Sequence, residues 1–68
     1  MLDVKYNIKG IVSSIYECQK KIILNRRFIR EIESEGKDAT KLNLENEKLE
    51  GRISELQKEL KKKYQFSY

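Results

Sequence analysis

A seven-residue repeat between residues 42 and 60 constrains the fold of this chain more than any other feature. The pattern is that of the a and d positions of a helix that packs lengthwise against another helix. A partner helix must therefore come from elsewhere in the chain or from a second molecule. The repeat is carried on its two positions by Leu42, Leu49 and Leu56, and by Asn46, Ile53 and Leu60.

A matching repeat lies upstream and predicts the partner helix, over about residues 10–34. No proline interrupts it. Residues 2–9 leave two alternatives open, because their apolar residues alternate as in a strand but also continue the helical repeat. The upstream repeat consists of Ile8, Ile15, Ile22 and Ile29, with Ile11, Cys18, Asn25 and Ile32 on the neighbouring position.

The segment between the repeats has the composition of a turn between two helices. Gly36 suits a left-handed helix C-cap, and Asp38 or Thr40 suits the N-cap of the next helix. We expect a turn at about residues 35–38 and a second helix over about 39–64. Residues 64–68 are expected to be either helical or extended, and in extended form they would pair with residues 2–9. The whole chain, 1–68, is then one all-α domain, an antiparallel two-helix coiled-coil hairpin.

In an antiparallel hairpin the residue numbers of facing positions add to a constant. The two repeats predict a register in which this constant is about 71. This constant places the two polar residues of the seam, Asn25 and Asn46, in one layer. Paired amides satisfy each other, whereas an amide facing leucine would cost about 1 to 3 kcal/mol. Two alternatives remain open: hydrated asparagines at the seam edge, and one long helix running through Gly36 into a parallel coil.

Composition argues against several classes of protein. The chain has 68 residues, no histidine and one cysteine, so it cannot form an internal disulfide and lacks most catalytic side chains. We expect no enzyme activity, no metal, no cofactor and no small-molecule ligand, with Cys18 acting as a small apolar residue of the seam. No apolar run is long enough for a membrane span and no signal peptide is evident. We therefore expect a cytoplasmic protein without a membrane partner.

The first helix carries more apolar surface than one hairpin can bury. A chain of this size usually needs a further stabilising contact, and self-association is the remaining choice. We expect a homodimer that forms a four-helix bundle, serving as a protein-protein interaction module: a regulator, inhibitor or assembly factor. A structural coiled-coil assembly is a further alternative. The predicted self-association residues are Val12, Tyr16, Ile23, Leu24 and Phe28.

Charge supports a second hypothesis, the binding of nucleic acid at the open end of the hairpin. The net charge is +4, but residues 31–55 hold four basic and eight acidic residues, so the positive excess lies elsewhere. Arg26, Arg27 and Arg30 are expected to lie opposite Glu45 and Glu47. The remaining lysines, interleaved with aromatic residues, suit phosphates and unstacked bases, or simply complement the helix dipole. This candidate patch comprises Lys5, Lys9, Lys58, Lys61, Lys62, Lys63, Tyr64, Phe66 and Tyr68.

Overall fold

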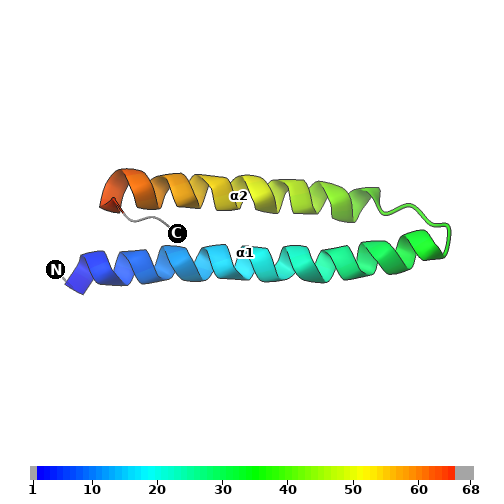
Figure 1. Cartoon of the computed structure of the whole chain (residues 1–68), viewed down its shortest axis with the longest axis horizontal. Helices are drawn as coiled ribbons and strands as arrows, with labels where there is room; N and C mark the ends of the chain where they lie inside the picture. The colour runs from blue at the N-terminus through cyan, green and yellow to red at the C-terminus, as the bar shows by residue number, and fades with distance from the viewer. Residues whose placement is uncertain (1, 66–68) are drawn as a thin grey trace.

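Two antiparallel helices form the whole of the described structure (Figure 1). A computed structural model describes the backbone of residues 2–65 and the side chains of residues 7–65. Helix α1 spans Leu2–Ser34 and helix α2 spans Thr40–Tyr64, and the two lie side by side in a rod of 53 × 16 × 15 Å. The prediction of an all-helical hairpin is confirmed.

Residues 2–9 belong to α1, so the extended alternative for this segment is wrong. The helix is favoured there because Ile8 and Ile11 pack against the buried cluster of Ile15, Leu56 and Leu60. A glycine at position 10 costs a helix about 1 kcal/mol relative to alanine, which this packing offsets. Residues 2–9 are therefore not a strand that could pair with the other end of the chain, of which residues 66–68 lie outside the described part.

The turn after α1 is a Schellman motif centred on Gly36. The glycine has φ of 75°, in the left-handed region where a side chain is strained. Its N–H donates to the carbonyl of Glu33 at 3.0 Å, and the N–H of Lys37 donates to the carbonyl of Ile32 at 3.0 Å. These two bonds satisfy carbonyl groups that the end of a helix leaves free, and they reverse the chain.

Helix α2 begins one residue away from the predicted caps. Ala39 occupies the N-cap position, and its side chain is buried in the seam. Asp38 supplies the capping group instead, because its Oδ1 accepts the N–H of Thr40 at 3.1 Å and also the Thr40 hydroxyl. At the other end Gln65 adopts φ of 53° and donates its N–H to the carbonyl of Lys61 at 3.1 Å.

The core is a narrow seam whose best-buried part lies toward the open end of the hairpin. Ile15 and Leu60 are fully buried, and Leu56 is nearly so. Such a core leaves one side of each helix facing solvent. Partly buried residues complete the cluster: Ile8, Ile11, Val12, Ile53 and Tyr64.

A buried polar layer interrupts the seam at Asn25 and Asn46, which are only 5% and 8% exposed. Nδ2 of Asn25 donates to Oδ1 of Asn46 at 2.9 Å, and Nδ2 of Asn46 donates to the carbonyl of Ile22 at 3.5 Å. Among the described residues no buried side-chain nitrogen or oxygen lacks a partner. The structure thus brings the two asparagines together in the register whose facing numbers add to 71.

Truncating one asparagine should cost more than replacing both. We expect Asn25→Ala to lower the free energy of unfolding by about 1 to 3 kcal/mol, because it leaves Oδ1 of Asn46 buried without a donor. The double variant Asn25→Leu/Asn46→Leu should recover most of that loss. Urea unfolding of Asn25→Leu, Asn46→Leu and the double leucine variant at one protein concentration closes the double-mutant cycle and measures the coupling. Simple additivity of the two single losses would contradict the pairing.

Two glycines are expected to respond in opposite directions to alanine. A Cβ at Gly36 meets no neighbour, yet the positive φ there makes Gly36→Ala destabilising, by about 1 kcal/mol. Gly51 lies within α2, and a Cβ there also meets nothing within 4 Å. Gly51→Ala should therefore raise the free energy of unfolding by up to about 1 kcal/mol. Thermal unfolding of both variants tests the left-handed conformation of Gly36. Equal changes in melting temperature for the two variants would contradict that conformation.

Candidate functional site

The outward surface of α1 carries most of the exposed large apolar side chains. Ile23 is 65% exposed and Tyr16 is 57% exposed, and Leu24 and Phe28 are 49% and 44% exposed. Among the described side chains of α2, only Leu44 is comparable, at 52%. The outward surfaces of the two helices therefore differ: that of α2 is polar, whereas that of α1 is partly apolar.

These apolar residues divide between two sides of α1. A helix turns by 100° per residue, so Tyr16 and Ile23 lie on one side, and Leu24 and Phe28 lie on the other. The grooves beside them agree with this division. Ile23 lines a groove with arginine side chains, whereas Leu24 lines a separate groove with Cys18 and Leu49.

Val12 and Cys18 occupy intermediate positions. Val12, the fifth predicted self-association residue, is half-buried and packs against the core cluster of its own hairpin. Cys18 is a free thiol, half-buried at the edge of the seam. Four of the five predicted self-association residues are therefore exposed on α1, while Val12 contributes mainly to the hairpin itself.

Ion pairs between the helices flank the seam on both sides. Lys21 Nζ lies 3.2 Å from Glu45 Oε1, and Arg26 Nη2 lies 3.7 Å from Glu50 Oε1. The sequence places Arg26 opposite Glu45 and Glu47, and this prediction is wrong. The residue numbers of facing pairs add to 71 only within the seam. Each ion pair on a flank joins residues that are offset from this register by about five positions.

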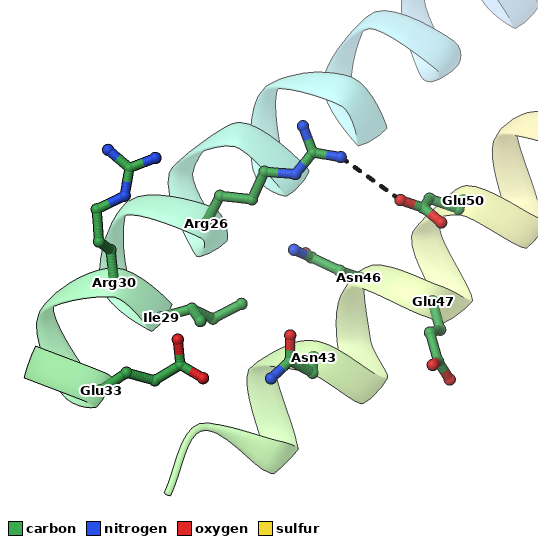
Figure 2. A pocket seen from close by; sticks show the side chains of 8 residues that line it. All are labelled: Arg26, Ile29, Arg30, Glu33, Asn43, Asn46, Glu47 and Glu50. Carbon is green, nitrogen blue, oxygen red and sulfur yellow. Dashed lines mark ion pairs between the residues drawn. The ribbon is translucent and has the colours of Figure 1, made fainter. Parts of the chain in front are cut away.

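Two arginines of α1 form no ion pair within residues 7–65. Arg27 and Arg30 are exposed, and together with Arg26 they line a surface groove that also includes Ile23 and Ser34. Figure 2 shows that Arg26 reaches across to Glu50, whereas Arg30 extends away from α2. We call this surface, lined by Ile23, Arg26, Arg27, Arg30, Glu31 and Ser34, the arginine groove.

The arginine groove is the feature that sequence reasoning missed. A simple signal marks it in the sequence, because residues 18–30 contain five basic and no acidic side chains. Helical spacing would have placed Arg27 and Arg30 beside Ile23, because positions three and four apart share a helix face. The expectation that all three arginines meet glutamates of α2 removed them from consideration.

The predicted basic end is only partly assembled as a binding surface. Lys9, Lys58, Lys61 and Lys62 are exposed near the open end. Lys63 pairs with Glu59 at 3.3 Å. The other predicted members differ: Tyr64 packs against the core cluster, the Lys5 side chain is not among those described, and Phe66 and Tyr68 lie outside the described residues.

Two carboxyl groups have lowered pKa values for identifiable reasons. The side chain of Lys21, and after it the Asn25 amide, lowers the pKa of Glu45 below its ordinary value of 4.5. The hydroxyl and then the N–H of Thr40 lower the pKa of Asp38 below its ordinary value of 3.8. Both carboxylates therefore support the hairpin, one across the seam and the other at the start of α2.

Within residues 7–65, no group of three or more histidine, cysteine, aspartate or glutamate side chains is placed to hold a metal ion. None of the helices described is long and apolar enough to cross a membrane. The surfaces that remain as candidate sites are the outward apolar residues of α1, the arginine groove and the basic end.

Comparison with known proteins adds no family to this picture. No protein-family model matches the chain, and neither the curated proteins nor the solved structures include a significant match.

The free energy of unfolding should fall in acid because the pKa values of Asp38 and Glu45 are lowered in the folded protein. A lowered pKa in the folded state gives stabilisation that is complete above the ordinary pKa and is lost as the pH falls through the lowered value. We expect the free energy of unfolding to decrease as the pH drops below about 4.5. Urea unfolding across this range should show a weaker pH dependence in Glu45→Gln. Glu55→Gln is the control, and an equal change there would show that Lys21 is not the cause.

Proposed function

We propose that this protein is a small non-enzymatic protein-protein interaction module, acting as a regulator, inhibitor or assembly factor. The exposed apolar surface of α1 supports the proposal more than any other observation. Four large apolar side chains on one helix remain between 44% and 65% exposed in the isolated hairpin. Exposed apolar side chains in this number on one helix are typical of surfaces that bind other proteins.

Self-association through this surface would complete a four-helix bundle, with the two α1 helices at the centre and the two α2 helices outside. Leu24 and Phe28 form the best candidate contact, because they are four residues apart and so share one side of α1. The charged side chains beside them are of both signs, including Glu17, Lys21 and Glu31. A symmetric contact there brings opposite charges within reach of each other.

The alternative of nucleic-acid binding at the basic end has weaker support. Stacking on bases requires accessible rings, yet Tyr64 packs against the core cluster. Lys63 is paired with Glu59, although Lys58, Lys61 and Lys62 remain exposed. The lysines of the last turn also stabilise α2 by complementing its dipole.

The oligomeric state tests the proposal directly. Light scattering at micromolar concentration should give the mass of a dimer for the natural chain. The variant Leu24→Ser/Phe28→Ser should give the mass of a monomer, with helical circular dichroism retained, because the seam residues are unchanged. Leu44→Ser removes an equally exposed leucine from α2 and should leave the dimer intact. A monomeric natural chain would refute self-association.

A further inference from the structure

We propose that the arginine groove docks an acidic amphipathic helix of a partner protein. The proposal concerns the Tyr16 and Ile23 flank of α1, which lies about a third of a turn around the helix from the flank assigned to self-association. It does not depend on the dimer, because Leu24 and Phe28 lie outside the groove.

Charge is the first argument. Residues 18–30 contain Lys20, Lys21 and the three arginines of the groove, and no acidic residue. Lys21 and Arg26 are engaged with Glu45 and Glu50, but the latter pair is 3.7 Å apart and largely exposed. Arg27 and Arg30 have no carboxylate partner among residues 7–65. Exposed guanidinium groups without an ion pair attract the carboxylates of a partner, which they bind in a bidentate manner.

The apolar side chains on this flank of α1 are the second argument: Ile23 lines the groove, and Tyr16 lies outside its lining on the same flank. Tyr16 and Ile23 are seven residues apart, which is two helical turns, so they are aligned on one side of α1. Both are more than half exposed. Arg27 and Arg30 continue the same stripe toward the turn. The stripe from Tyr16 to Arg30 is about 21 Å long, which matches roughly four turns of a partner helix. That helix would need apolar residues at one end and acidic residues at the other.

Two other occupants fit this surface less well. A second copy would bring an equally basic groove against the first, which like charge disfavours. Glu31 lines the groove, and Glu33 and Glu50 lie near Arg26 and Arg30 (Figure 2), so an anionic partner fits only if its charges are confined to the arginines. A helix can place a few glutamates in this way, whereas a nucleic acid carries a phosphate at every nucleotide. A phosphate backbone also offers no apolar group to cover Ile23. An acidic helix meets the charged and the apolar requirements together.

Titration with designed peptides tests the proposal. The first probe is an amphipathic helical peptide of about 14 residues with leucines on one face and glutamates toward one end, the length that covers the stripe. The second has glutamine in place of each glutamate, and the third probe is duplex RNA. We expect the acidic peptide to bind and to shift the amide resonances of Tyr16, Ile23, Arg27 and Arg30. The glutamine peptide and the RNA should bind far more weakly.

Matched variants separate the groove from general positive charge. Arg27→Gln/Arg30→Gln should weaken binding of the acidic peptide by roughly tenfold or more, because the variant lacks the two guanidinium groups that form charge-assisted hydrogen bonds with the peptide carboxylates. Lys61→Gln/Lys62→Gln removes the same charge at the open end and should leave the affinity nearly unchanged. Light scattering on every variant shows whether the dimer persists. A loss of self-association is thereby distinguished from a loss of peptide binding.

Several outcomes would overturn the proposal. The first is the absence of binding by the acidic peptide at millimolar concentration, and the second is equal binding by the glutamine peptide. Equal weakening by the arginine and lysine variants would show only long-range attraction. Tighter binding of the RNA, lost in the arginine variant, would assign the groove to nucleic acid instead.

Discussion

The hydrogen bond between Asn25 and Asn46 is the interaction on which the register of the hairpin depends. Apolar seams tolerate sliding by a heptad, because leucine and isoleucine layers are nearly equivalent to one another. A slide would bury each amide against apolar side chains, at a cost larger than the worth of any single surface ion pair. One polar layer therefore selects the alignment from which the ion pairs, the turn and the outward surface of α1 all follow.

Much of the fold could be predicted from the sequence, because the two repeats and Gly36 are strong local signals. The start of α1 could not, since residues 2–9 fit periods of both two and 3.6, and only packing of Ile8 against the far end of α2 decides between them. The N-cap was predicted at Asp38 or Thr40 and lies at Ala39, although Asp38 still supplies the capping carboxylate. Ala39 enters the seam, so the carboxylate before it reaches the free N–H.

The surfaces were harder to predict than the seam. Helical periodicity correctly identified apolar residues in excess on the first helix, and it also places Tyr16 and Ile23 on one flank and Leu24 and Phe28 on the other. The charged flanks depend on long side chains whose reach is not encoded in residue numbering, as the Arg26–Glu50 pair shows. Arg27 and Arg30 form no ion pair among residues 7–65, whereas Lys21 and Arg26 pair with Glu45 and Glu50.

The position of the best-packed cluster has a consequence for folding. The asparagine layer joins residues 21 positions apart in the chain, whereas Ile15 and Leu60 are more than twice as far apart. Closing longer loops costs more entropy, so contacts near the Schellman turn form with the smallest loss. The fully buried contacts of Ile15 and Leu60 close the longer loop and so carry the larger entropic cost. A chain closed only near its turn thus gains little, and the hairpin must close along its length before it is stable, which favours all-or-none folding over a half-zipped form.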